Sequence, residues 1–119
     1  FPSGSWKVND NGKKAIVELA KVLVQQSDIQ IMVEGHTDDV PYKGTGLIKD
    51  NWDLSVMRAT AIVRILSNNK GLKANRITAA GKGSHSPLVE NNSSENRAVN
   101  RRTEIILSPN MDKLMELLD

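Results

Sequence analysis

The chain has 119 residues with 16 basic and 14 acidic side chains, a net charge of +2 and no cysteine. This length suits one domain with one core. The small charge excess gives no reason to expect a nucleic-acid partner, and the lack of cysteine excludes disulfides and cysteine-based zinc sites. No apolar run is long enough to span a bilayer, and no signal-peptide pattern begins the chain. Because Phe1 is not a start residue, we expect a fragment, and any signal, lipid anchor or membrane segment upstream in the parent protein would lie outside it.

The predicted elements alternate between strand and helix. Residues 1–6 are expected to form the end of a strand cut short. Apolar residues at helical spacing then predict a helix over about residues 11–26, with Asn9 or Asp10 as its cap. Alternation of apolar and other residues predicts a strand that Gly35 ends. Residues 36–49 lack periodicity and predict a long loop, which in a compact domain is often functional.

The second half continues the alternation. A helix capped by Asp50 or Asn51 is predicted to fade at residues 67–69. Further elements are predicted as a strand at 76–81, a loop at 81–90, a short helix at 94–99, a strand at 102–107 that ends before Pro109, and an amphipathic helix at 111–118. This order predicts an α/β (α+β) sandwich of βαβαββ type, with helices packed on a mixed four-stranded sheet. Residues 1–108 would form the domain and residues 109–119 an appended helix.

Two charged residues suggest a binding site. Asp38 lies just beyond a strand, where open α/β sheets place ligands, although it could instead only order its own loop. Arg58 lies two turns into a predicted helix and offers a planar fork suited to a carboxylate. The alternative for Arg58 is a surface ion pair of little consequence. Together the two match a ligand with an ammonium beside a carboxylate, as in an amino acid.

Polar residues near this pair extend the prediction. Asn51 stands at a helix N-terminus, which accepts carboxylates, but it could serve only as a cap. Arg101 and Arg102 precede the last strand and point to opposite faces. One is expected to brace the site loop and the other to meet solvent or a glycan; alternatively, both are solvated edge charges.

The residues do not favour catalysis. His36 with Asp38, Asp39 and His85 is a weak metal signal, and a packed, hydrogen-bonded His36 is the preferred interpretation. Ser55 lies inside a predicted helix rather than on a nucleophile elbow. Adjacent Asp38 and Asp39 would point apart and make a poor acid/base pair. We therefore expect no enzyme, no metal and no cofactor.

Five motifs in order resemble one family. They are Gly-His-Thr-Asp at 35–38, Asn-x-x-Leu-Ser-x-x-Arg-Ala at 51–59, Gly-x-Gly at 81–83, Pro87, and Asn-Arg-Arg-x-Glu-Ile at 100–105. This set resembles the OmpA-like family of peptidoglycan-binding domains over about residues 1–107. The resemblance implies non-catalytic recognition of diaminopimelate in the wall stem peptide by an envelope protein at the periplasmic face of the Gram-negative outer membrane.

The resemblance also implies residue roles. Asp38 would meet the ligand ammonium and Arg58 its carboxylate. The other residues carried over to the site are Thr37, Asn51, His36 and Arg102. The segment at 40–50 is longer than in OmpA itself, so Tyr42, Lys43 or Lys49 could add contacts. Open alternatives are a periplasmic dimerisation and wall-anchoring domain of a MotB-like flagellar stator, with a homodimer interface on the 110–118 helix, and, less favoured, a wall hydrolase.

Overall fold

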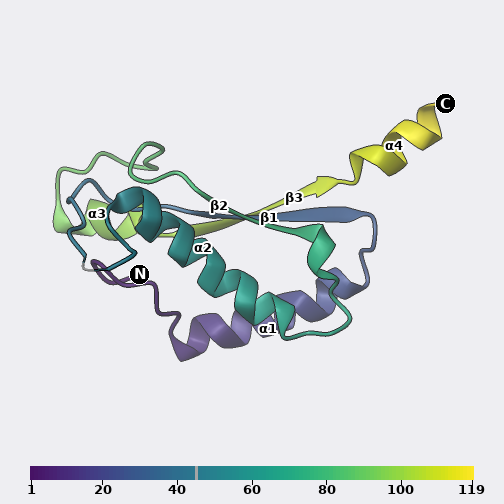
Figure 1. Ribbon diagram of the computed structural model, residues 1–119, viewed down its shortest axis with the longest axis horizontal. Coiled ribbons are helices and arrows are strands. Elements are labelled where there is room, and N and C mark those ends of the chain that lie inside the picture. Colours follow the sequence, from purple (N-terminus) through teal and green to yellow (C-terminus); the bar gives the residue numbers. More distant parts are fainter. Residues whose placement is uncertain (45) are drawn as a thin grey trace.

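A three-stranded sheet with two helices on one face forms the body of the computed structural model (Figure 1). The structure describes residues 1–44 and 46–119, apart from the side chain of Lys113. Strand β1 (Ile29–Gly35) is central, between parallel β2 (Ile77–Gly81) and antiparallel β3 (Thr103–Pro109). No helix in the described part of the chain is both long and apolar enough to cross a membrane.

The two long helices begin where side chains cap them. Helix α1 (Asp10–Val24) begins after Asn9, whose side-chain oxygen accepts from the Gly12 amide at 2.7 Å. Helix α2 (Asn51–Ser67) begins after Asp50, which accepts from the Asp53 amide at 3.0 Å. These bonds satisfy amides that have no partner within the helix. Of each pair of predicted caps, Asn9 and Asp50 are the residues that cap.

The core lies between the helices and the sheet. Ile31 and Val33 of β1 are buried against apolar residues of both helices, as the two-residue period of a strand requires of one face. The remaining buried members of this core are Ala20, Leu23, Ala59, Ile62, Leu66 and Leu72. Arg76, in the short 3-10 turn Ala74–Arg76 before β2, donates to the carbonyls of Leu23, Gln26 and Ile29. It thus ties the end of α1 to the start of β1.

The predicted fourth strand is wrong for the described residues. Residues 1–6 contain a turn and no strand, and three of their carbonyl oxygens accept from arginine side chains instead of from a neighbouring strand. Arg58 takes two of these carbonyls and Arg101 takes that of Phe1. The last strand also runs further than predicted, to Pro109, whose missing N–H is tolerated at the end of the β1–β3 ladder.

The last helix extends away from the body. Helix α4 (Met111–Leu118) follows β3 directly and points outward in Figure 1. Its exposed apolar side chains are Met111, Leu114, Met115, Leu117 and Leu118. The predicted amphipathic helix is therefore present, and within the residues described its apolar side faces solvent.

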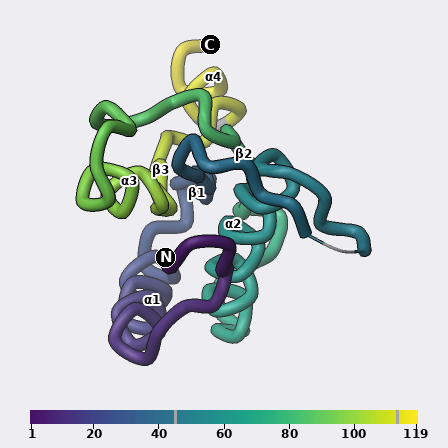
Figure 2. The backbone as a smooth tube through the Cα atoms, turned by 90° about the vertical axis from the view of Figure 1, so that its left-hand side faces the viewer, coloured from purple at the N-terminus to yellow at the C-terminus, as the bar shows by residue number. Residues whose placement is uncertain are grey.

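The opposite end of the sheet gathers the polar motifs. The ends of β1 and β2, the start of α2 and helix α3 (Ser94–Asn100) converge there, together with the N-terminal segment (Figure 2). Gly35 makes this convergence close, because a Cβ at Gly35 would lie 1.8 Å from the Ser55 carbonyl oxygen of α2. Only a residue without a side chain allows the end of β1 to lie against α2 in this way.

Candidate functional site

The turn after β1 is fixed by backbone hydrogen bonds to both neighbouring strands. The His36 amide donates to the Arg102 carbonyl at 2.9 Å, and the Thr37 amide donates to the Gly83 carbonyl at 2.9 Å. The Lys82 amide returns a bond to the Gly35 carbonyl at 3.0 Å. Asp38, the next residue, is therefore held at a defined place beyond the strand end.

Asp38 is a buried carboxylate with a cationic neighbour. One oxygen accepts from the Val40 amide at 3.1 Å and the other from Nη1 of Arg101 at 2.8 Å. The Asp38 side chain is 6% exposed and that of Arg101 is 17% exposed. Asp38 thus orders its loop through the Val40 amide, as one interpretation of the sequence required, and its other oxygen is paired with Arg101. The arginine expected to brace the site loop is Arg101.

Arg58 is fully buried and donates to three backbone carbonyls. Its Nε, Nη1 and Nη2 donate to Ser5 at 2.8 Å, His36 at 2.9 Å and Pro2 at 3.1 Å. Burial lowers the pKa of the guanidinium to about 10, with Asp38 opposing the shift and Arg101 adding to it. Arg58 therefore remains a cation at neutral pH, and the surface ion pair considered as its alternative is wrong.

The N-terminal residues 1–5, here called the strap, cover Arg58. Besides the two carbonyl contacts, the Phe1 ring lies 5.1 Å from the guanidinium carbon. Three of the five guanidinium N–H groups are used by the bonds described. The strap thus supplies two of the three carbonyl oxygens that accept from Arg58.

Asn51 carries a buried acceptor without a donor. Its Nδ2 donates to the Val40 carbonyl at 3.1 Å, which fixes the orientation of the amide. Its Oδ1 is buried and has no hydrogen-bond partner within the described part of the molecule. A buried acceptor without a donor costs about 1–3 kcal/mol, so a ligand N–H at this point would be favourable.

These side chains line one small pocket of about 90 Å³. Asp38 and Asn51 contribute acceptors, and Arg58 and Arg101 contribute donors; the other lining residues are Ser3, Gly4, Val40, Pro41, Tyr42, Lys43 and Leu54. Two of the three residues predicted to add contacts from the 40–50 segment, Tyr42 and Lys43, are among them. Lys49 is not, and residue 45 of that segment lies outside the described residues.

Three other predicted site residues lie next to the pocket without lining it. Thr37 is buried and donates from its hydroxyl to the Asp38 carbonyl at 2.8 Å. Arg102 donates to the carbonyls of Ser86 at 3.1 Å and Asn100 at 3.3 Å. The His36 ring is buried beside Glu34. Their contacts support the turn and the neighbouring loop.

The metal group considered from sequence does not assemble. His85 stacks on Trp52 with ring centroids 4.8 Å apart, and Asp39 pairs with Arg97 at 2.9 Å. Ser55 is engaged as well, because its hydroxyl donates to the Trp52 carbonyl and accepts from the Gly83 amide. The Ser55 hydroxyl is therefore held by two backbone groups, and His85 and Asp39 are held by partners other than His36.

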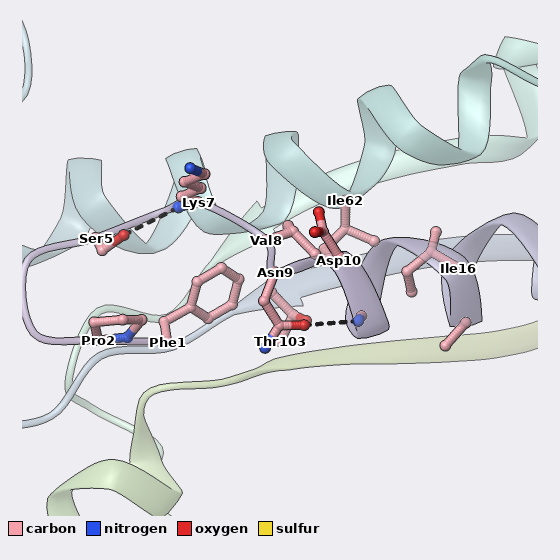
Figure 3. Close-up of a pocket in the computed structure, with 12 residues that line it drawn as sticks. Phe1, Pro2, Ser5, Lys7, Val8, Asn9, Asp10, Ile16, Ile62 and Thr103 are labelled. Atoms are coloured by element: carbon pink, nitrogen blue, oxygen red, sulfur yellow. Dashed lines mark hydrogen bonds between the residues drawn. The ribbon is translucent and has the colours of Figure 1, made fainter.

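A larger cavity of about 660 Å³ lies on the other side of the strap (Figure 3). Its walls come from residues 1–12, the first turns of α1, Ile62 of α2 and Thr103 of β3. The figure shows apolar side chains such as those of Phe1 and Ile62 together with polar ones, among them the charged Lys7 and Asp10, with the Asn9 cap drawn bonded to the first turn of α1. Lys7 and Asp10 are exposed, whereas the smaller pocket holds the buried charges of Asp38 and Arg58. The smaller pocket is therefore the candidate site.

The order of motifs and the fold agree with a family model described as the OmpA family, which matches residues 1–101. The chain belongs to the OmpA family. This confirms the resemblance seen in the sequence. The mixed arrangement of helices and sheet agrees with solved domains of relatives, although the sheet of the described residues has three strands where four were predicted.

Three relatives show the range of the similarity. Motility protein B of Bacillus subtilis is 34% identical over 109 residues, covering 92% of this chain and 41% of that protein. The peptidoglycan-associated lipoprotein of Buchnera aphidicola is 35% identical over 106 residues, covering 89% and 58%. The crystal structure of the C-terminal domain of Helicobacter pylori MotB is 30% identical, with a TM-score of 0.82, covering 100% of this chain and 92% of that one. The chain thus spans about half the length, or less, of these curated relatives.

Proposed function

We propose that this OmpA-family domain binds peptidoglycan without catalysis and anchors an envelope protein to the cell wall. The observation that carries the proposal is the pocket in which Asp38 and Asn51 offer acceptors beside the donors Arg58 and Arg101. One relative is named a peptidoglycan-associated lipoprotein, which supports the same ligand here. The proposed location is the cell envelope, at the periplasmic face of an outer membrane.

The proposed ligand group is the ammonium–carboxylate end of diaminopimelate in the stem peptide. Pockets for whole small molecules usually measure about 300–1,000 Å³, whereas this one measures about 90 Å³. It suits one polar end of a ligand whose remainder lies outside. The ammonium would donate to Asp38 and to the unpaired Oδ1 of Asn51. The carboxylate would accept from Arg58, with Arg101 nearby to balance the added negative charge.

The strap has to yield before a carboxylate reaches Arg58. The guanidinium has no exposed surface, and the Pro2 and Ser5 carbonyls occupy two of its donors. The ligand carboxylate would replace one or both carbonyls and so exchange neutral acceptors for a charged one. The carbonyls already bond to a charged donor, so the gain lies in the second charge: a carboxylate pairs with the guanidinium ion to ion and can accept two parallel N–H bonds, which a single carbonyl cannot.

The proposal predicts modest affinity for one stem peptide. Displacing the strap consumes part of the interaction energy, and association entropy consumes several kcal/mol more. Firm attachment would arise because many stem peptides are presented along the wall and several copies of the parent protein bind at once.

An NMR titration of this chain with a diaminopimelate-containing stem peptide tests the proposal, with the lysine analogue as the control ligand. We expect saturable shifts at Asp38, Asn51 and Arg58. Asp38→Asn should abolish them, while Asp39→Asn, which affects only the half-exposed pair with Arg97, should leave them intact. Absence of shifts at millimolar peptide, or equal loss in both variants, would refute the assignment. Equal shifts with the lysine analogue would refute diaminopimelate selectivity alone.

A second variant tests the strap. Gly4 has φ +66°, and an added Cβ would lie 3.5 Å from the Tyr42 ring. The cost to alanine at such a backbone angle is about 1–2 kcal/mol, so Gly4→Ala should loosen the strap. If the strap must open, affinity should rise by up to about 5- to 30-fold. Unchanged or weaker binding would show that the ligand does not displace the strap.

A second candidate function is that of a wall-anchoring domain in a flagellar stator. The observation that favours it is the similarity to the Helicobacter pylori MotB domain over the whole of this chain. A homodimer would then be expected, with α4 as a candidate interface. Sedimentation velocity over a range of concentrations tests this, since a mass that stays monomeric at high concentration argues against a dimeric domain.

The wall-hydrolase alternative is tested by incubating the protein with a suspension of purified sacculi. A binding module is expected to leave the suspension turbid, and clearing would favour a hydrolase.

A further inference from the structure

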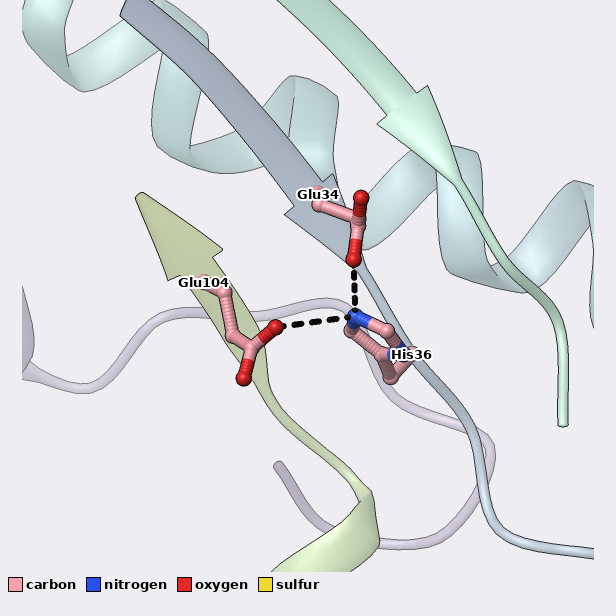
Figure 4. A group of neighbouring side chains, drawn as sticks. All are labelled: Glu34, His36 and Glu104. Atoms are coloured by element: carbon pink, nitrogen blue, oxygen red, sulfur yellow. Dashed lines mark hydrogen bonds and ion pairs between the residues drawn. The ribbon is translucent and has the colours of Figure 1, made fainter. Parts of the chain in front are cut away.

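A second group of polar residues lies at the same end of the sheet, outside the small pocket. Glu34 of β1 and Glu104 of β3 are direct partners in the antiparallel ladder, so their side chains lie on one face of the sheet. His36 follows Glu34 by two residues and turns its ring toward both carboxylates (Figure 4). One oxygen or nitrogen from each residue lies within 4.8 Å of the others. The register of two strands therefore brings these three side chains together.

Figure 4 shows the imidazole Nε2 between the two carboxylates. It lies 2.8 Å from Oε1 of Glu34 and 3.5 Å from Oε2 of Glu104. His36 is 1% exposed and Glu34 is 7% exposed. Within the described residues, Nε2 of His36 is the one hydrogen-bond partner of the Glu34 carboxylate. A buried carboxylate is ordinarily satisfied by several donors or by a cation, whereas this one has a single partner among the described residues and a side chain that is 10% exposed.

The charge balance of the cluster is negative. Arg102 faces it and donates to Glu104 over a long 3.4 Å. Two carboxylates thus face one guanidinium, a balance that favours a cation, and the Glu104 side chain, 39% exposed, leaves the cluster open to solvent on one side.

We propose that Glu34, His36 and Glu104 form a binding site for one divalent transition-metal cation of the Zn²⁺ or Mn²⁺ type. An imidazole nitrogen with carboxylate oxygens is a ligand set that such ions accept. The fold holds Glu34 and His36 on a rigid central strand, and the half-exposed Glu104 side chain gives the ion a way in. Solvent would complete the coordination on that side.

The required adjustments are small: Glu104 has to rotate, and Nε2 and Oε1 of Glu34, now 2.8 Å apart, have to separate by about 0.6 Å to reach the spacing of two zinc ligands. Ligands of a tetrahedral ion with bonds near 2.1 Å lie about 3.4 Å from one another. Nε2 and Glu104 already lie 3.5 Å apart, and the widest spacing in the group is 4.8 Å. Rotation of the Glu104 carboxylate, whose bond to Arg102 is long, would bring the set together.

Metal binding would change the tautomer of His36. The 2.8 Å contact between Nε2 and Oε1 of Glu34 fits a metal-free tautomer in which Nε2 carries the ring proton and the carboxylate accepts it. A metal at Nε2 requires the lone pair of that nitrogen, so the proton moves to Nδ1. Nδ1 is buried and has no partner within the described residues, so this transfer reduces the affinity without preventing binding. The position of the ring proton is therefore a direct reporter of the site.

The test uses the 119-residue chain stripped with EDTA and titrated with Zn²⁺ in a buffer that does not bind metals. Isothermal titration calorimetry should show one ion per chain. Long-range ¹H–¹⁵N spectra should show the His36 proton moving from Nε2 to Nδ1. With Mn²⁺ as the probe, amide signals should broaden around Glu34, His36 and Glu104, and this measurement needs no variant.

Two variants separate the site from surface binding. Glu104→Gln removes a ligand from a half-exposed position and should weaken Zn²⁺ binding by at least about tenfold. His85→Gln removes the other histidine, which stacks on Trp52, and should leave the affinity unchanged. No Zn²⁺ binding at millimolar ion, no change of tautomer, or loss of binding in His85→Gln with retention in Glu104→Gln would overturn the proposal. Because the stem-peptide titration can be run in EDTA, its outcome is independent of this one.

Discussion

Replacing Arg58 by lysine should destabilise the domain although the charge is kept. The three carbonyls bound by Arg58 are reached by three different nitrogens, at 2.8, 2.9 and 3.1 Å. A lysine has one nitrogen, so it cannot replace the planar fork. We expect about two of the three bonds to be lost. At about 1.5–3 kcal/mol for each bond to a charged group, the free energy of unfolding should fall by about 3 kcal/mol or more.

Thermal unfolding followed by circular dichroism measures this loss. With an unfolding entropy of about 2.1 cal/mol/K per residue, a loss of 3 kcal/mol corresponds to a fall in Tm of about 12 °C. Arg64→Lys is the matched control, because Arg64 is an exposed residue in the last turn of the same helix. Its change should stay within about 0.5 kcal/mol, or about 2 °C.

The same variant tests the ligand site. Lysine offers a point charge where the bound carboxylate is proposed to meet a fork, so stem-peptide affinity should fall as well. Equal Tm values for Arg58→Lys and Arg64→Lys would refute the account of Arg58 as the donor that holds strap and turn together. If Arg58→Lys had normal stability but no longer bound the peptide, the proposed role of Arg58 in ligand binding would stand and its proposed structural role would not.

Two further predictions concern the fold. Gly35→Ala would place a Cβ 1.8 Å from the Ser55 carbonyl oxygen. Because the backbone must then move, we expect the free energy of unfolding measured in urea to fall by about 3 kcal/mol and peptide binding to weaken. Gly12→Ala is the control, and it should be close to neutral because the added Cβ meets only side chains at 3.1 Å or more. A Gly35→Ala protein as stable as the wild type would contradict the close approach of β1 and α2. Removal of residues 111–119 should leave Tm nearly unchanged, because α4 extends from the body. A large fall in Tm would show that α4 packs on the domain. If the intact chain has a concentration-dependent mass and the shortened chain does not, the dimer interface lies on α4.

Local sequence was sufficient for most elements because their signals are local. Helix α2 was predictable from its apolar spacing and from the Asp50–Asn51 start, although only the structure shows that Asp50 is the cap. The strand ended by Gly35 matches its prediction for a similar reason, since alternation and a terminal glycine are read within a few residues. Proline is usually expected to end a strand because it has no backbone N–H to donate. Strand β3 nevertheless extends to Pro109, because the last position of the strand does not require that N–H.

The candidate site shows where local signals stop. Asp38, Arg58 and Asn51 were predicted and all line the pocket, yet Arg101 was not chosen over Arg102. The two arginines are adjacent, and only the end of α3 decides which one turns toward Asp38. Likewise, nothing in residues 1–5 by themselves indicates that their carbonyls would bind Arg58, which lies more than fifty residues later.

The sequence by itself determined the family, the order of most elements and the chemical types at the site, because motif spacing and side-chain period are properties of short segments. The tertiary structure decided which charges pair, that the strap covers Arg58, and that Glu34, His36 and Glu104 meet. These outcomes depend on strand register and on contacts between segments distant in the chain. Their energies are set by burial, which exists only once the chain has folded.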